Sequence, residues 1–212
     1  LRGRVNFETG EVALDGLDSW RPNKIHSVAC GTSKNSALVG RFYLENLARI
    51  PTEVDYGSEF RYRDPLIQPG DAILGITQSG ETADTLAAMH EGRQKGARVW
   101  SIVNAIGSQA ERASDATIGM RTGPEIGVCS TKTFVASIID QYMLACFLAQ
   151  QSADKAVAGR GFAAAKELSH LPGLVSKVLD ANPIYDELAN KFHDRKHFLF
   201  LGRGMNYPIA LE

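Results

Sequence analysis

The chain has 212 residues, enough for one domain with sequence to spare, since domains cluster around roughly 100–150 residues. Its hydrophobic content of 44% and charged content of 22% are ordinary for a globular protein. A formal net charge of -1 argues against nucleic acid or an anionic membrane surface as a partner, and no apolar run approaches the roughly 18–20 residues that span a bilayer.

The cysteines and histidines do not suggest a metal centre. Cys30, Cys129 and Cys146 are odd in number and lack metal-ligand spacing, which favours buried thiols in a reducing compartment over a disulfide framework. We therefore expect a cytoplasmic protein without a metal or a cofactor. The histidines show no ligand spacing either and are interpreted as surface or packing residues: His26, His90, His170, His193 and His197.

Short apolar runs define the first half of the chain. Residues 1–23 are polar and rich in turn-forming residues, and we interpret them as a lead-in linker. The runs that follow are continuous rather than alternating, which is typical of parallel strands covered on both faces. We predict strands at 26–30, 52–57, 71–77, 97–103 and 115–120.

Helical patterns separate these runs, at 33–48, 81–95 and 131–150. The last pattern is apolar nearly all round, which predicts burial in the core or against a partner subunit. Strands that alternate with helices through short connections predict an α/β fold with a doubly wound parallel sheet over 24–150. In such a sheet, ligands bind beyond the carboxyl ends of the strands.

The remainder of the chain has a different pattern. Residues 151–196 contain no strand-like run, and we predict two or three connecting helices, one of them starting at Asn182-Pro183. Residues 197–212 then repeat the pattern of the first predicted strand and helix, HSVACGTSKNSALVG: an apolar strand at 197–201, a glycine turn and the start of a helix. We expect this to be the truncated start of a second domain, and the chain to be a fragment of a longer protein.

The sequence GITQSGET at 75–82 resembles a nucleotide-binding P-loop in which Glu81 replaces the lysine that grips the phosphates. The loop joins a predicted strand to a predicted helix, and a helix N-terminus binds anions without a lysine. Glu81 fits the first turn of that helix, with its carboxylate directed away from the anion. The loop therefore suits a phosphate monoester better than a nucleoside triphosphate with Mg²⁺. Its four side-chain hydrogen-bond donors are Thr77, Gln78, Ser79 and Thr82.

Two further loops place hydroxyl groups at helix starts. ACGTSKNS carries Thr32 and Ser33, and GPEIGVCSTKTF carries Ser130 and Thr131. A doubly wound sheet brings such loops together at one edge, which predicts a site for a phosphate on a polyhydroxylated body. The alternative is that Ser79-Gly80 is only a polar turn with incidental capping.

With these loops in view, the chain resembles the isomerase half of the glutamine–fructose-6-phosphate aminotransferases, which consists of two sugar-isomerase (SIS) domains. The matching segments are LRGRV, ACGTSKNS, SEFRYR, TQSGETADT, EIGVCSTKTF and LGRGMNYPIALE. The resemblance implies that Thr32, Val128 and Ser130 line the sugar. Thr77 stands where a serine is usual and keeps the hydroxyl. The residues implied to hold the phosphate of fructose 6-phosphate or glucosamine 6-phosphate are Ser33, Thr77, Gln78, Ser79 and Thr82.

The resemblance also implies what lies elsewhere in the family. A preceding glutaminase domain supplies ammonia, the general base is a glutamate in a K-L-K-E segment after the A-L-E sequence, and the isomerase half dimerises. Glu212 corresponds to the A-L-E glutamate, not to that base. We therefore expect a homodimer that binds sugar phosphate, with no catalytic residue within the chain. Glu125, in the loop before Val128, is the acid nearest to the expected sugar.

Two other functions stay open from the sequence. The chain could be a non-catalytic SIS sugar-phosphate sensor of a transcription regulator, which shares the GITQSGET-type loop. Such a module should lack EIGVCSTK and a second SIS start, and it should carry a DNA-binding segment. A nucleotide-binding module is disfavoured by the missing lysine.

Overall fold

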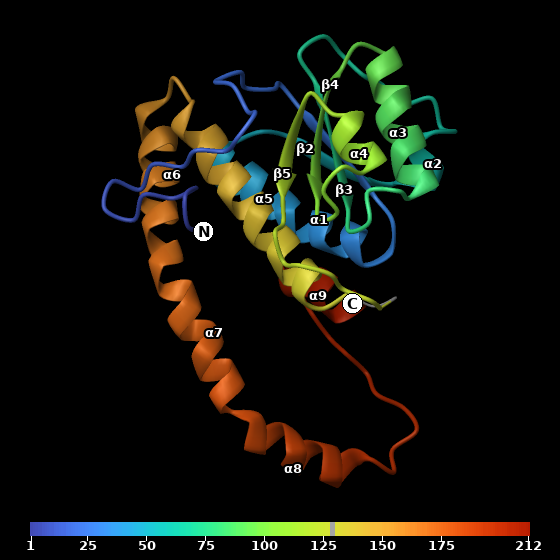
Figure 1. Cartoon of the computed structure of the whole chain (residues 1–212), viewed down its shortest axis with the longest axis vertical. Helices are drawn as coiled ribbons and strands as arrows, with labels where there is room; N and C mark the ends of the chain where they lie inside the picture. Colours follow the sequence, from blue (N-terminus) through green and yellow to red (C-terminus); the bar gives the residue numbers. More distant parts are fainter. Residues whose placement is uncertain (128–129) are drawn as a thin grey trace.

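The computed structural model describes residues 1–127 and 130–212. Its centre is a five-stranded sheet with the order β2-β1-β3-β4-β5, in which all neighbouring strands are parallel (Figure 1). The predicted doubly wound α/β fold is confirmed, and each of the five strand predictions matches a strand within one or two residues. The strands are β1 (Ile25–Ala29), β2 (Thr52–Tyr56), β3 (Ala72–Thr77), β4 (Arg98–Val103) and β5 (Ala116–Gly119).

Helices cover both faces of the sheet. Along β3, Leu74 and Ile76 pack into the core beneath α1, α5 and α6, whereas Ile73 packs into a second cluster with Phe60 and Met89 from the opposite helices. Successive strand residues point to opposite faces, so a continuous apolar run serves two cores. One face carries α1 (Gly31–Tyr43), a π-helical turn (Leu44–Ala48), α5 (Lys132–Gln150) and α6 (Lys155–Glu167), and the other α2 (Gly57–Phe60), α3 (Ala83–Gln94) and α4 (Gln109–Arg112).

The long apolar helix α5 is a core element. By length and composition its 19 residues suffice to cross a membrane, contrary to the expectation from the sequence, but most of the helix is buried inside the protein. It packs between α1 and α6, where Met143, Leu144 and Leu148 are almost fully buried. Near its N-terminal end, Val135 is 50% exposed, so the helix is not covered on all sides.

The polar N-terminal segment is packed onto this core. Val5, Val12 and Leu14 are buried in the main hydrophobic cluster. Arg4 makes a buried ion pair of 3.1 Å between its Nη1 and Oδ1 of Asp140 on α5, and its Nη2 donates to the carbonyl oxygen of Gly119 at 2.8 Å. The segment interpreted as a linker therefore packs against α5 and against β5, the edge strand of the sheet.

The buried carboxyl of Asp140 predicts a stability that depends on pH. Burial raises its pKa from 3.8 to about 7, although the neighbouring Arg4 guanidinium acts in the opposite direction. Between pH 3.8 and about 7, the unfolded chain has lost the Asp140 proton that the folded chain keeps. The free energy of unfolding therefore falls as the pH rises, by at most about 1.4 kcal/mol per pH unit.

Urea unfolding of the wild type and of Asp140→Asn should give a difference in stability that changes from pH 4 to 7. In Asp186→Asn, an exposed control on a peripheral helix, the pH profile should follow the wild type. A constant difference between wild type and Asp140→Asn would contradict this assignment.

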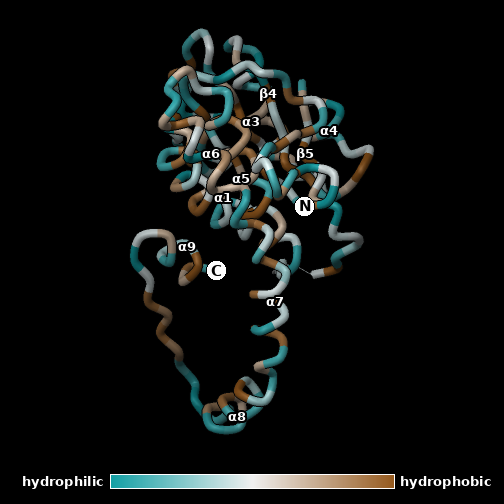
Figure 2. The backbone as a smooth tube through the Cα atoms, turned by 90° about the vertical axis from the view of Figure 1, so that its left-hand side faces the viewer, coloured by the Kyte–Doolittle hydropathy of each residue, from teal (hydrophilic) through white to brown (hydrophobic). Residues whose placement is uncertain are grey.

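The C-terminal part projects from the body and returns to it. After a 3-10 turn (Leu168–His170), α7 (Leu171–Asp180) and α8 (Asn182–Phe192) extend away from the sheet, and α9 (Asn206–Leu211) comes back beside α1 (Figures 1 and 2). The prediction of two or three helices in 151–196 is confirmed by α6, α7 and α8. The predicted strand at 197–201 is wrong. This stretch is extended but exposed, because it has no neighbouring strand to pair with among the described residues.

Candidate functional site

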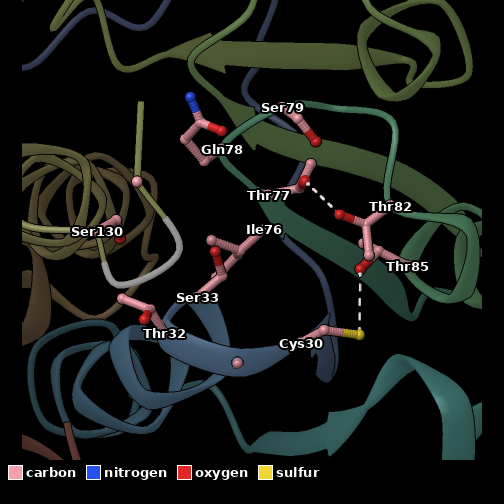
Figure 3. A pocket seen from close by; sticks show the side chains of 12 residues that line it. Cys30, Thr32, Ser33, Ile76, Thr77, Gln78, Ser79, Thr82, Thr85 and Ser130 are labelled. Atoms are coloured by element: carbon pink, nitrogen blue, oxygen red, sulfur yellow. Dashed lines mark hydrogen bonds between the residues drawn. The ribbon is translucent and has the colours of Figure 1, made fainter. Parts of the chain in front are cut away.

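A polar pocket lies at the carboxyl ends of β1 and β3 (Figure 3). Its volume is about 240 Å³, below the roughly 300–1,000 Å³ of sites for drug-sized ligands, so it suits a small molecule. The carboxyl end of a strand is where the architecture predicts a ligand. Residues lining the pocket are Cys30, Gly31, Thr32, Ser33, Ile76, Thr77, Gln78, Ser79, Thr82, Thr85, Gly127 and Ser130.

The structure brings most of the predicted site residues together. Seven of them line this single pocket, and only Val128 lies outside the described residues. Their role in binding a ligand stays a prediction. The seven come from three loops that are distant in the sequence: Thr32, Ser33, Thr77, Gln78, Ser79, Thr82 and Ser130.

In the loop after β3, backbone N–H groups orient the hydroxyl groups so that these can donate hydrogen bonds to a ligand. The backbone N–H of Gly80 donates to Oγ1 of Thr77 at 3.2 Å, and the N–H of Glu81 donates to Oγ of Ser79 at 3.2 Å. A hydroxyl that accepts a backbone hydrogen bond keeps its own proton for another acceptor. Thr77 is also 3.3 Å from the hydroxyl of Thr82, so the two form a linked pair (Figure 3). The loop can therefore offer the proton of Ser79 and one proton of the Thr77–Thr82 pair to one anion.

Two helix N-termini border the same pocket. Cys30 is the N-cap of α1 and Thr82 is the N-cap of α3, and neither side chain accepts a hydrogen bond from its helix. The first-turn N–H groups are therefore not capped by these residues, and the helix dipoles add positive potential. None of the described pocket-lining side chains carries a formal charge. Attraction for an anion at this site would come from amides, hydroxyls and dipoles.

The role expected for Glu81 is corrected by the structure. Helix α3 starts at Ala83, so Glu81 lies in the loop and not in the first turn. Its carboxylate accepts hydrogen bonds from the backbone N–H of Gln109 at 2.9 Å and from its side-chain Nε2 at 2.5 Å. Glu81 thus binds the start of α4, a contact between loops that no local pattern encodes. It does not line the pocket.

Glu125 has a structural role at the start of α5. Its Oε1 accepts hydrogen bonds from the N–H groups of Thr131 and Lys132 at 3.2 and 3.1 Å, and its Oε2 accepts one from the hydroxyl of Thr133. These bonds, led by that of Thr133, lower the pKa of Glu125 to about 2. A carboxylate that holds its proton so weakly is a poor general base near neutral pH.

Sequence reasoning missed Thr85 and left Cys30 as a packing residue. Thr85 is 1% exposed, and its hydroxyl donates to Sγ of Cys30 at 3.8 Å on the floor of the pocket (Figure 3). The signal for Thr85 was available, because it follows Thr82 by three residues and so lies on the same helix face. Cys30 is partly exposed in the pocket.

Among the described residues, no group of three or more His, Cys, Asp and Glu side chains is arranged to hold a metal ion. The pocket chemistry in this part of the chain is that of hydroxyl groups and amides. Such a set suits a phosphate and a sugar rather than Mg²⁺ or Ca²⁺, which prefer carboxylate ligands.

Two curated proteins to which the chain is similar carry the same enzyme name. The chain is 42% identical, over its full length, to a glutamine–fructose-6-phosphate aminotransferase (isomerizing) of Chlorobaculum tepidum and covers 35% of it. It is 44% identical to the enzyme of that name from Mycobacterium tuberculosis, with 99% of the chain and 33% of the relative covered. The chain thus spans about a third of the length of these curated relatives.

A solved structure shares the fold. It is described as the C-terminal domain of glucosamine-fructose-6-phosphate aminotransferase from Francisella tularensis, with a TM-score of 0.83 and 33% identity. The alignment covers 95% of this chain and 57% of that one. A family model described as the SIS domain matches residues 20–146, more than half of the chain. The chain therefore belongs to the SIS domain family, and it matches the isomerase region of the glutamine–fructose-6-phosphate aminotransferases.

Proposed function

We propose that the chain is the sugar-phosphate-binding isomerase domain of a glutamine–fructose-6-phosphate aminotransferase. The observation that carries the proposal is the uncharged pocket in which two helix N-termini and the hydroxyl groups of three loops converge. An anion without a metal suits such a pocket. The ligand is fructose 6-phosphate or glucosamine 6-phosphate, in keeping with the names of the relatives.

The proposed pose follows from the position of the donors. The phosphate lies on the loop Thr77–Thr82 and on Ser33, where hydroxyl protons and first-turn amides are concentrated. The sugar extends towards Thr32 and Ser130, which lie on the other side of the pocket (Figure 3). By the resemblance, Val128 also lines the sugar.

In the whole protein, a partner glutaminase domain would supply ammonia from glutamine. Ammonia adds to the open-chain ketose, and a general base then moves a proton between C1 and C2 to give the amino aldose. The role of the SIS domain is to hold and orient the sugar phosphate for these steps. Such an enzyme of central sugar metabolism would be cytoplasmic, and the proposal needs no cofactor.

The pose is tested by following backbone amide resonances while fructose 6-phosphate is added. The largest shifts should fall on residues 31–33 and 77–83, and inorganic phosphate should compete at residues 77–83 and at Ser33. Shifts confined to α7 and α8, or no competition by phosphate, would contradict the proposed function.

Alone, the chain is expected to have no turnover. A proton transfer between C1 and C2 needs a base within hydrogen-bond reach. The pocket-lining residues in the described part of the chain include no carboxylate or imidazole, and the carboxylate of Glu212, outside this lining, is bound by Thr32 and Asn35. Fructose 6-phosphate with ammonia or glutamine should give no glucosamine 6-phosphate, and no deuterium should enter the sugar in heavy water. Turnover that Glu125→Gln or Glu212→Gln abolishes would contradict this prediction.

The chain is also expected to form a homodimer. An apolar groove runs between α1, α5 and the start of α7, and the exposed faces of α7 and α8 carry Leu174, Leu179 and Ile184. Leaving such surface in water is unfavourable, so a second copy should cover part of it. Sedimentation at tens of micromolar should show a dimer, weakened in Leu179→Asp and unchanged in the nearby polar control Lys177→Gln. A monomer at that concentration would contradict the expectation. The groove residues are Tyr43, Val135, Ile138, Ile139, Tyr142, Leu168 and Leu171.

A further inference from the structure

The C-terminal segment reaches the pocket that the first half of the chain builds. Helix α9 packs beside α1, with Pro208 buried in the contact. Beyond it, Oε1 of Glu212 accepts a hydrogen bond from the hydroxyl of Thr32 at 2.5 Å, and Oε2 accepts one from Nδ2 of Asn35 at 2.9 Å. Thr32 lines the pocket, so a carboxylate is bound directly to a pocket residue.

This contact decides how Thr32 can bind a ligand. A threonine hydroxyl has a single proton and two lone pairs. The 2.5 Å distance is typical of a hydroxyl that donates to an ionised carboxylate, one of the stronger hydrogen bonds in proteins. Asn35 lies one helical turn after Thr32 and holds the second carboxylate oxygen, which fixes the orientation. Thr32 therefore has its lone pairs left for the pocket and no proton.

The opposite side of the pocket donates hydrogen bonds instead of accepting them. There Thr77 and Ser79 accept backbone N–H groups, so Ser79 keeps its proton for a ligand and the Thr77–Thr82 pair keeps one of its two. A phosphate dianion only accepts hydrogen bonds, whereas a sugar hydroxyl can donate. The pocket thus has a donor end at the loop of Thr77 and an acceptor end at Thr32.

We propose that Glu212 is a positioning residue that acts through Thr32, making it an acceptor for a sugar hydroxyl and directing the phosphate to the opposite loop. The inference rests on the proposed function, because it deepens the way in which the same pocket orients a sugar phosphate. A phosphate placed at Thr32 would find no proton there and would face the negative charge of Glu212. The substrate can then enter in only one orientation.

The test compares affinities for fructose 6-phosphate and for inorganic phosphate in the same chain. Glu212→Ala should reduce the preference for the sugar phosphate by up to about tenfold, because the Thr32 hydroxyl is then free to turn its proton towards the sugar, and an ordinary hydrogen bond to a sugar hydroxyl is worth about that much in affinity. Glu212→Gln keeps an acceptor oxygen for Thr32 and should retain most of the preference. Glu187→Ala, an exposed carboxylate on α8, is the matched control and should leave the preference unchanged.

A double-mutant cycle separates an action through Thr32 from a direct one. Thr32→Val should lower the preference as Glu212→Ala does, and the double variant should lose no more than Thr32→Val alone. An unchanged preference in Glu212→Ala, or fully additive losses, would overturn the inference while the proposed function stands. A wild-type chain that binds neither ligand would instead overturn the proposed function, and the inference with it.

Discussion

Gly80→Ala is expected to abolish sugar-phosphate binding at concentrations where the wild type is saturated. Gly80 has a φ of +71°, and a Cβ atom there would lie 2.1 Å from Oγ of Ser108 and 2.9 Å from Cγ2 of Val103. The left-handed conformation alone costs a residue with a side chain about 1–2 kcal/mol. The loop must move to relieve the contact, and the hydroxyls of Thr77 and Ser79 then lose their backbone partners.

Calorimetry should show affinity for fructose 6-phosphate reduced at least about a hundredfold, since two or more hydrogen bonds of about 1.5–3 kcal/mol to the charged phosphate are lost together. Thermal unfolding should show a moderate loss of stability. The matched control is Gly159→Ala on α6, where an added Cβ meets nothing within 4 Å and φ is not positive. It should bind normally. Wild-type affinity in Gly80→Ala would show that the loop after β3 does not hold the phosphate.

Ser79→Ala and Thr82→Ala are expected to weaken binding of fructose 6-phosphate by about tenfold or more each. In the proposed pose each hydroxyl donates to a charged phosphate, and such a bond is worth roughly 1.5–3 kcal/mol. The hydroxyls do not stabilise the fold to the same degree, because Ser79 and Thr82 lie in a partly exposed loop. Their variants should therefore unfold at nearly the wild-type temperature.

Calorimetry with fructose 6-phosphate measures these losses, and Ser176→Ala on the exposed face of α7 serves as the hydroxyl control. In the proposed pose both hydroxyls bind the same phosphate, so the double variant should lose less than the sum. Binding that survives in both single variants, with the fold intact, would place the phosphate elsewhere.

The sheet and most of the pocket could be predicted from the sequence. Continuous apolar runs such as 71–77 indicate strands that are covered by helices on both faces of the sheet. The structure places β3 between two hydrophobic cores. Hydroxyl residues at or just beyond the ends of two such runs, Thr32 and Thr77 among them, meet at one edge because parallel strands end on the same side. These are consequences of local pattern combined with one architectural rule.

What could not be predicted depends on contacts between distant segments. Glu81 accepts hydrogen bonds from Gln109, and Glu212 accepts one from Thr32. Both contacts join residues far apart in the sequence, and no periodic pattern in the sequence indicates them. The burial of Arg4 against Asp140 likewise turned a polar, linker-like stretch into part of the core. The apolar stretch 197–201 has residues that favour a β-strand. A strand forms only where its backbone can hydrogen-bond to a neighbouring strand, and none lies beside this stretch in the described chain.

The central claim, that the pocket recognises a phosphate on a sugar, is tested most directly by calorimetry with fructose 6-phosphate and with fructose. Most of the proposed contacts go to the phosphate, from the loop Thr77–Thr82, Ser33 and two helix N-termini. We expect measurable heat and saturable binding for fructose 6-phosphate, inorganic phosphate as a weaker competitor, and no binding of fructose at the same concentrations. Fructose bound as tightly as fructose 6-phosphate would contradict the account.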